Sequence, residues 1–249
     1  MKRWGKLFLV AVQFLTRLPV SRKADLPADA LGRAAVFFPL IGLALGAGGV
    51  ALDHLLSPHS NRSVVTVFVL IYLVVVTGGL HEDALADAAD GFGGGWKKEE
   101  MLAIMRDSRI GSFGTMAVAL SLLARFACLE SLPMRDFDRI FVAGQVLNRW
   151  TALPLGFFLR SAREGSGQGA LVAQKISGAV LGIGTALAIA IVAFLLGWKA
   201  VWTILAAVTV TALTAFYYQN RIGGVTGDCM GATNQIAEVA VYFAGVLIR

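Results

Sequence analysis

Four long stretches without a charged residue most constrain how this chain can fold. They cover residues 34–52, 63–80, 176–197 and 200–220. A helix needs about 20 predominantly apolar residues to cross the hydrocarbon core of a bilayer. Backbone polar groups in that core must be hydrogen-bonded within the protein, which a helix achieves by itself. The stretches therefore predict membrane-spanning α-helices.

Composition agrees with a membrane protein. Of the 249 residues, 57% are hydrophobic and 15% are charged, and the mean hydropathy is +0.70. An average soluble domain has about 25% charged residues. Further apolar stretches cover residues 110–124, 140–159 and 239–248. We expect an all-α, polytopic membrane helix bundle with about six to seven transmembrane helices, forming a single integral-membrane domain over residues 1–249.

The chain start combines basic residues with an apolar segment. Residues 1–20 contain no small-residue cleavage site, so an amphipathic or re-entrant helix is favoured over a cleaved signal peptide. Cys128 and Cys229 lie far apart and form no CxxC motif, which indicates neither a disulfide framework nor a zinc site.

Positive charge is unevenly distributed between the loops. With a cytoplasmic N-terminus and seven spans, the segments 1–33, 81–109, 160–175 and 221–235 face the cytoplasm. They contain fifteen of the 22 Lys and Arg residues, against five on the opposite side. Lys and Arg are enriched in cytoplasmic loops, so this orientation is favoured. Topology also explains the net charge of +6, without a nucleic-acid partner.

The stretch GGLHEDALADAADGFGGG, residues 78–95, follows an apolar segment and introduces several carboxylates. On a helix, Asp83, Asp87 and Asp90 share one face, where they repel one another. A divalent cation would relieve this repulsion, and oxygen ligands without nearby cysteine favour Mg²⁺ or Mn²⁺ over Zn²⁺. The pattern predicts a Mg²⁺ site for a diphosphate, with a solvated acidic helix end as the alternative. Glu82 lies on another face and is not an expected ligand.

A second loop, MRDSRIGSFG at 105–114, carries Arg106 and Arg109 on either side of Asp107. The arginine side chain is suited to bidentate phosphate recognition. The loop is therefore a candidate phosphate-binding segment, although a capped helix start flanked by positive charges has the same appearance.

A third loop lies within NRIGGVTGDCMGATNQIAE at 220–238. Its glycines allow backbone amides to approach an anion closely, and Thr226 and Asp228 supply a hydroxyl and a carboxylate. The segment lacks the Gly-Lys-Ser/Thr of a Walker A motif. Because all three polar loops are expected on one membrane side, together they indicate a phosphate-bearing substrate.

Several residues within the apolar stretches are informative. Gly42 and Gly46 suit close helix–helix approach in lipid. Arg149 lies about ten residues into its stretch, so we expect it to face the bundle interior and to have a partner or a ligand there. Arg125 lies near the end of its stretch, and we expect its guanidinium to extend to the membrane surface.

Five segments together resemble the cobalamin synthase (adenosylcobinamide-GDP ribazoletransferase) family. They are FLTRLPV, RAAVFFPLIGLALG, GGLHEDALADAADGFGGG, MRDSRIGSFG and GGVTGDCMGA, in family order across nearly the whole chain. The resemblance implies a multi-pass enzyme of the bacterial inner membrane with cytoplasmic active-site loops. Such enzymes use Mg²⁺ to join adenosylcobinamide-GDP to α-ribazole or its 5′-phosphate, and they release GMP.

The family pattern and the residue chemistry described above together give the expected role of individual residues. It reads G-G-L-H-L-D-G-L-A-D-T-x-D-G, and this chain departs from it at Glu82, Ala84 and Ala88 while keeping the histidine and the three aspartates. The metal ligands are then Asp83, Asp87 and Asp90, and the proton acceptor is His81 or Asp228. The predicted substrate-binding residues are Arg106, Asp107, Arg109, Arg149 and Thr226.

Two other classes of protein use carboxylates at membrane level. A membrane phosphotransferase or prenyltransferase acting on a lipid diphosphate would carry D-G-x2-A-R with G-x3-D-x3-D, or D-D-x2-D motifs, which are absent here. A transporter with an ion site would place its carboxylates near the middle of a span. The expected partners are therefore small-molecule substrates and the lipid bilayer, and self-association as a homo-oligomer is left open.

Overall fold

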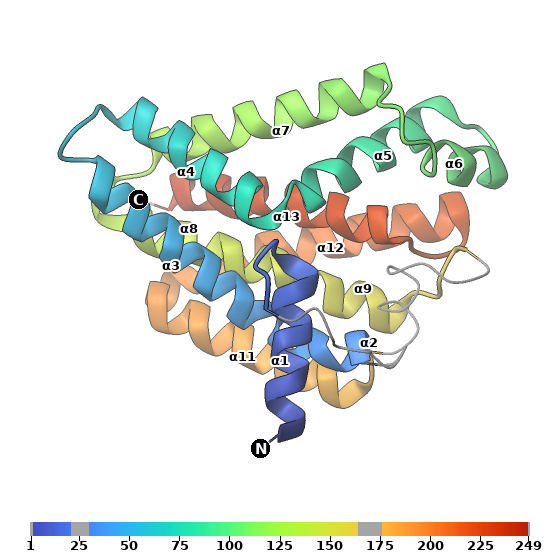
Figure 1. Cartoon of the computed structure of the whole chain (residues 1–249), viewed down its shortest axis with the longest axis horizontal. Helices are drawn as coiled ribbons and strands as arrows, with labels where there is room; N and C mark the ends of the chain where they lie inside the picture. The colour runs from blue at the N-terminus through green and yellow to red at the C-terminus, as the bar shows by residue number, and fades with distance from the viewer. Residues whose placement is uncertain (1, 21–29, 164–175, 249) are drawn as a thin grey trace.

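The chain is almost entirely helical in the computed structural model, which describes residues 2–20, 30–163 and 176–248 (Figure 1). The described helices are, in chain order, α1 (Lys2–Leu15), α2 (Ala30–Ala34), η1 (Ala35–Phe37), α3 (Phe38–Leu56), α4 (Arg62–Thr77), α5 (Leu80–Gly94), α6 (Lys98–Ile104), α7 (Ser112–Ser131), α8 (Met134–Trp150), α9 (Ala152–Phe158), α11 (Gly178–Leu196), η2 (Gly197–Lys199), α12 (Ala200–Ile222) and α13 (Gly227–Leu247). Within these ranges there is no strand, only an isolated parallel bridge between Ser161 and Val225. The expectation of an all-α fold is confirmed.

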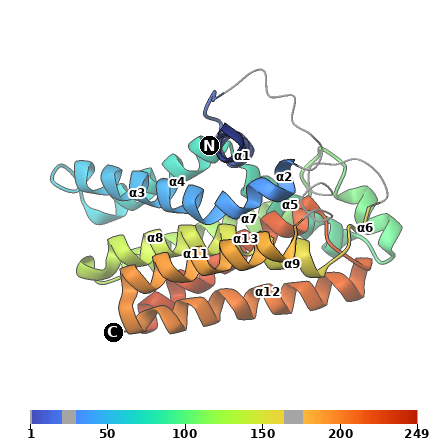
Figure 2. The same ribbon diagram turned by 90° about the horizontal axis from the view of Figure 1, so that it is seen from below.

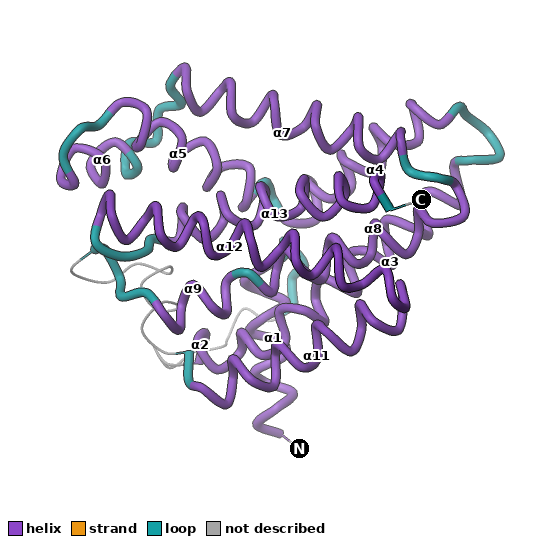
Figure 3. The backbone as a smooth tube through the Cα atoms, turned by 180° about the vertical axis from the view of Figure 1, so that it is seen from behind, coloured by secondary structure: helices purple, strands orange, loops and turns teal. Residues whose placement is uncertain are grey.

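Helices α8 and α13 form the centre of the bundle. Helix α8 packs against α3, α11 and α13, while α13 also packs on α5, α7 and α12 (Figures 1 and 3). Residues 140–150 of α8 are all buried. A Cβ on Gly46 of α3 would lie 2.9 Å from the Val142 Cα, and Gly42 faces the main chain of Gln145. The expected close helix approach at these two glycines is confirmed.

Three described helical stretches are long and apolar enough to cross a membrane: Ala30–Leu56, Ser112–Ser131 and Gly178–Ile222. A fourth crossing is obtained if α4 and α5, which meet at 86°, are counted together. This is fewer than the six to seven spans expected. The central helices α8 and α13 bury many polar side chains, so they lack the composition of a lipid-facing span.

The longest stretch, Gly178–Ile222, folds back on itself. Its 45 residues would extend about 68 Å as one straight helix, more than twice the roughly 30 Å thickness of the hydrocarbon core. Gly197 has a φ of 57°, a conformation that glycine adopts readily. Helices α11 and α12 then run side by side (Figure 2). This stretch therefore supplies a pair of antiparallel helices.

The N-terminal helix α1 runs across the other helices of the bundle (Figure 1). It buries Val10, Ala11 and Leu15 and exposes Trp4 and Phe8. With 14 residues it is too short to span a bilayer. A short helix with one buried side and exposed aromatic residues matches the amphipathic helix expected here.

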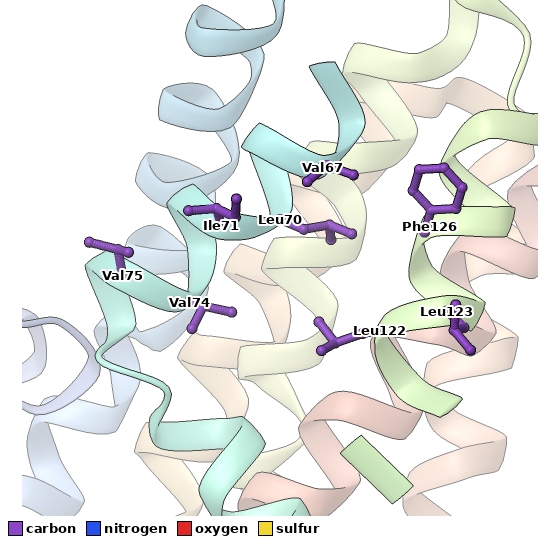
Figure 4. A pocket seen from close by; sticks show the side chains of 8 residues that line it. All are labelled: Val67, Leu70, Ile71, Val74, Val75, Leu122, Leu123 and Phe126. Carbon is purple, nitrogen blue, oxygen red and sulfur yellow. The ribbon is translucent and has the colours of Figure 1, made fainter. Parts of the chain in front are cut away.

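An apolar groove lies between α4 and α7 on the surface of the bundle (Figure 4). The lining side chains are all aliphatic or aromatic: Val67, Leu70, Ile71, Val74, Val75, Leu122, Leu123 and Phe126. Because α7 is one of the candidate spans, a groove of this composition suits contact with lipid acyl chains.

The polar loops collect at one end of the bundle. Helix α6, the end of α9 and the turn between α12 and α13 lie there, whereas the α3–α4 turn and η2 lie at the opposite end (Figures 1 and 2). The described loops that were expected to share one membrane side therefore lie together. Of the expected 160–175 loop, residues 164–175 fall outside the described residues.

Labelling from the two membrane sides tests this orientation. In a chain whose Cys128 and Cys229 are replaced, Lys98→Cys should react with a membrane-impermeant thiol reagent only from the cytoplasmic side, because α6 lies at the loop-rich, positively charged end. Ser57→Cys, at the end of α3, should react only from the outside. Labelling of intact cells and inverted vesicles gives the readout, and reaction of position 98 from the outside would contradict the orientation.

Candidate active site

The acidic helix α5 begins at a sharp bend after α4. Gly78 and Gly79 both have a φ of 68°, in the left-handed region that glycine enters at no steric cost. The main-chain N–H of Arg17, from the FLTRLPV segment, donates to the Val76 carbonyl at 2.7 Å. A Cβ on Gly78 would lie 2.6 Å from the Arg17 Cγ. The glycine pair therefore turns the chain and lets the N-terminal segment pack against the bend.

The three aspartates of α5 lie in different surroundings. Asp83 is exposed and Asp87 is half-buried, and neither carboxylate has a hydrogen-bond or ion-pair partner among the described residues. Asp90 is buried, and its carboxylate accepts hydrogen bonds from the Gly111 N–H at 2.6 Å and the Gly114 N–H at 2.8 Å. Asp90 therefore holds the start of α7, and its role as a metal ligand stays a prediction.

Asp228, in the first turn of α13, lies close enough to the α5 aspartates for its charge to act on Asp87. Burial raises the pKa of Asp87 to about 6, helped by the charges of Asp83, Asp228 and Asp90 and opposed by Arg163. The Arg163 Nη2 lies 2.8 Å from the Asp228 Oδ2. Helix α5 lies outside the three uninterrupted spans. The site is thus assembled from α5, α13 and the segment after α9.

Arg163 is a site residue that no pattern in the sequence revealed. The segment after α9 runs beside the start of α13, because the Val225 N–H donates to the Arg160 carbonyl at 2.8 Å and the Ala162 N–H donates to the Val225 carbonyl at 3.0 Å. Besides its pairing with Asp228, Arg163 has a buried Nε without a hydrogen-bond partner among the described residues. Its positive charge was the only signal that the sequence offered.

The donor set at these aspartates fits a hard divalent cation. Asp83, Asp87 and Asp228 offer the carboxylate oxygens that Mg²⁺ prefers, and a cation would relieve the repulsion among these carboxylates, which adds to the effect of burial on the pKa of Asp87. In the described part of the chain, the oxygens of these three residues do not all lie within 4.8 Å of one another. Mg²⁺ bound here would therefore complete its coordination with water or substrate oxygens, as it commonly does.

A tighter group of potential ligands lies at the opposite end of the bundle. Asp53, His54 and Asp138 bring one ligand atom each within 4.8 Å of the others. However, Asp53 forms an ion pair with Arg62, and His54 Nε2 lies 2.9 Å from Asp138 Oδ2. These side chains satisfy one another, so the group does not require a metal ion.

The two candidate proton acceptors lie in different surroundings. His81 is buried near the start of α5, where the charges of Arg149 and Arg125 act on its imidazole. Asp228 is half-buried and lies near the carboxylates of Asp83 and Asp87 on α5. Thr226, the predicted substrate-binding residue beside Asp228, caps α13 by accepting a hydrogen bond from the Cys229 N–H at 3.1 Å.

The arginines of the second loop are exposed. Arg109 has 88% of its side chain exposed and forms a bidentate pair with Asp107, in which Nη2 lies 2.6 Å from Oδ2. This pairing holds the pKa of Asp107 down at about 2. Arg106 is also exposed, and its side chain has no hydrogen-bond or ion-pair partner among the described residues. The loop reaches the C-terminal end of α5 through Gly111, while contacts of these arginines with substrate stay a prediction.

Arg149 is buried in a polar network at the bundle centre. It is 3% exposed, and its Nη1 donates to the side-chain oxygens of Gln145 and of Asn148, the latter at 2.7 Å. The same two amides donate to the carboxylate of Glu238 at 2.9 Å and 2.8 Å. The two amides therefore connect the buried cation to a buried anion, which confirms that Arg149 has partners within the bundle.

Arg125 does not extend to the membrane surface, so that expectation is wrong. It is 1% exposed, and both terminal nitrogens lie 3.1 Å from the Glu82 Oε1. The Glu238 carboxylate lies 3.8 Å from the Arg125 Nη1. Two carboxylates on neighbouring helices provide counter-charges for the guanidinium within the bundle. Pairing with them is more favourable than extending the side chain to the distant membrane interface, so the side chain turns inward.

Fold and site together define the class of this protein: a helical membrane protein with a group of carboxylates and an arginine at one end of the bundle. A family profile described as Cobalamin-5-phosphate synthase matches residues 7–246, and the chain belongs to that family. The resemblance seen in the five sequence segments is thereby confirmed.

Curated relatives agree over the full length. A protein of Shewanella piezotolerans named adenosylcobinamide-GDP ribazoletransferase is 33% identical, with 100% of this chain and 98% of the relative covered. Proteins of the same name from Shewanella amazonensis and Shewanella halifaxensis are each 37% identical, with 99% and 97% of this chain and 97% and 96% of the relatives covered. No solved structure matches the chain significantly.

Proposed function

We propose that this chain is a Mg²⁺-dependent enzyme of the bacterial inner membrane. It joins adenosylcobinamide-GDP to α-ribazole or its 5′-phosphate and releases GMP. The name of the relatives and the family description support the reaction. The active-site loops face the cytoplasm, in agreement with the distribution of Lys and Arg.

The observation that carries this proposal is the group formed by Asp83, Asp87, Asp228 and Arg163. It combines carboxylates without hydrogen-bond partners on α5 with a guanidinium that has a buried, unpartnered nitrogen. A diphosphate bound through Mg²⁺ complements this combination, because the metal takes carboxylate and phosphate oxygens together and arginine recognises phosphate oxygens. The exposure of Asp83 leaves the group open to a large, water-soluble substrate.

The reaction forms one bond and breaks another at a single phosphorus atom. A ribose hydroxyl oxygen attacks the phosphorus attached to cobinamide, and the bond from that phosphorus to the bridging oxygen breaks, so that GMP leaves. Asp228 or His81 accepts the hydroxyl proton, and Arg163 stabilises negative charge on the phosphate oxygens. When bound to Asp83 and Asp87, Mg²⁺ supplies charge neutralisation at the diphosphate.

Purified protein in lipid nanodiscs, supplied with adenosylcobinamide-GDP, Mg²⁺ and either form of ribazole, should release GMP and form the joined corrinoid in equal amounts. Removal of Mg²⁺ with a chelator should abolish both products, and re-addition should restore them. Both products are measured by chromatography. Turnover of a polyprenyl diphosphate in place of adenosylcobinamide-GDP would instead favour an enzyme that acts on a lipid diphosphate.

A further inference from the structure

A buried ion pair joins the acidic helix α5 to the membrane-spanning helix α7. Both terminal nitrogens of Arg125 donate to the Glu82 Oε1 at 3.1 Å, and the Gln235 side-chain amide of α13 donates to the same oxygen at 3.2 Å. Ser121 of α7 in turn donates to the Gln235 Oε1 at 3.2 Å. Three helices therefore meet at the carboxylate of Glu82, which directly precedes Asp83 in the chain.

The same helix is attached to α7 at a second point. Asp90 accepts hydrogen bonds from the Gly111 and Gly114 amides at the start of α7. Eight residues, or about 12 Å of helix, separate Glu82 from Asp90. The two attachments fix the position of α5 along α7 and its rotation about its own axis. Asp83 and Asp87 lie between the attachments. The contacts of Glu82 and Asp90 therefore set the direction in which the Asp83 and Asp87 carboxylates point.

Stability alone does not account for this ion pair. A buried ion pair commonly contributes no more than well-packed apolar residues of similar volume, because both charges lose their hydration. Unlike an apolar contact, the hydrogen bonds to the Arg125 guanidinium depend on direction, so they hold α5 in one rotational setting.

We propose that Glu82 and Arg125 are positioning residues, which hold α5 so that Asp83 and Asp87 present their carboxylates to one divalent cation. The proposal rests on the proposed function, since it concerns the same metal site. It does not require Glu82 or Arg125 to touch the metal or the substrate.

Metal binding by the protein alone tests the proposal. Mn²⁺ binding to protein in nanodiscs, followed by electron paramagnetic resonance of the unbound ion, should weaken at least about tenfold in Arg125→Leu. A purely electrostatic role for Arg125 predicts the opposite sign, because removal of a positive charge near carboxylates strengthens cation binding. Arg125→Lys, which retains the charge and one donor nitrogen, should recover part of the affinity.

Glu82 provides the complementary test. Glu82→Gln keeps an acceptor oxygen for Arg125 but loses the charge, whereas Glu82→Leu loses both. Positioning predicts that Glu82→Gln binds Mn²⁺ more tightly than Glu82→Leu, while a charge effect predicts equal losses. Lys199→Met, which breaks a 3.2 Å ion pair with Asp136 away from α5, is the matched control and should keep the wild-type affinity.

Two results would overturn the proposal. One is unchanged or tighter Mn²⁺ binding in a folded Arg125→Leu protein, and the other is equal losses in the two Glu82 variants. Thermal unfolding of each variant identifies the temperatures at which it is folded, so a purely structural role would lower the melting temperature and leave Mn²⁺ affinity unchanged. Wild-type protein that binds Mn²⁺ but releases no GMP would contradict the proposed function and leave the positioning role intact.

Discussion

Asp83→Asn and Asp87→Asn should each lower turnover of adenosylcobinamide-GDP by more than about a hundredfold, or at least about 2.7 kcal/mol of transition-state stabilisation. Asparagine is nearly isosteric with aspartate but neutral, so α5 should keep its packing while the site loses a charged ligand. Neither carboxylate has a hydrogen-bond partner among the described residues, so the substitution leaves no protein group unpaired. The loss should therefore appear in metal-dependent turnover and not in folding.

The measurement is GMP release against Mg²⁺ concentration for both variants. Glu99→Gln, an exposed carboxylate in the first turn of α6, is the matched control and should behave as wild type. Glu82→Gln, which the sequence alone would suggest as a control, is unsuitable because Glu82 is bonded to a buried arginine. Normal turnover with normal metal dependence in both Asp variants would rule out a metal site on this face of α5.

Arg149→Ala should remove most of the folded protein or most of its activity. The guanidinium donates to the side-chain oxygens of Gln145 and Asn148, whose amide groups donate to Glu238. Without the cation, these buried acceptors lose their donor, and Glu238 keeps only Arg125, at 3.8 Å, as a counter-charge. Breaking a buried charged network by removing one partner typically costs about 3 to 5 kcal/mol, a large part of the stability of a domain.

Yield of monodisperse protein, thermal unfolding and turnover measure this effect. Arg139→Ala is the matched control, because Arg139 lies on the same helix α8 but is exposed and should cost less than about 0.5 kcal/mol. Wild-type yield, melting temperature and turnover in Arg149→Ala would show that the network contributes neither to folding nor to activity.

Much of the fold and part of the site could be predicted from local sequence features. Uncharged stretches of about the length of a bilayer crossing require helices, because no other single segment satisfies its own backbone in lipid. Asp83 and Asp87 had to share a helix face once α5 was helical, because residues four apart are neighbours on any α-helix. Gly78 and Gly79 likewise allow an abrupt change of direction wherever they occur. These features depend on residues only a few positions apart.

The number of spans could not be obtained in the same way. Hydropathy reports which residues a segment contains, whereas the bundle decides which way they face. Helices α8 and α13 bury Gln145, Asn148 and Glu238 against one another. With these buried polar residues, neither helix has the composition of a lipid-facing span or of a helix in a soluble protein. Their partners are about 90 residues apart along the chain.

Tertiary structure also decided which charges work together. The sequence by itself determined the acidic face of α5 and the all-helical membrane class, since both follow from short-range spacing and composition. Only packing brings Arg163 to Asp228, 65 residues away, and turns Arg125 inward to Glu82, 43 residues away. The physical reason is that a charge in a low-dielectric interior is stabilised by pairing with a nearby counter-charge. Which counter-charge is near depends on how the helices pack and cannot be read from any single segment.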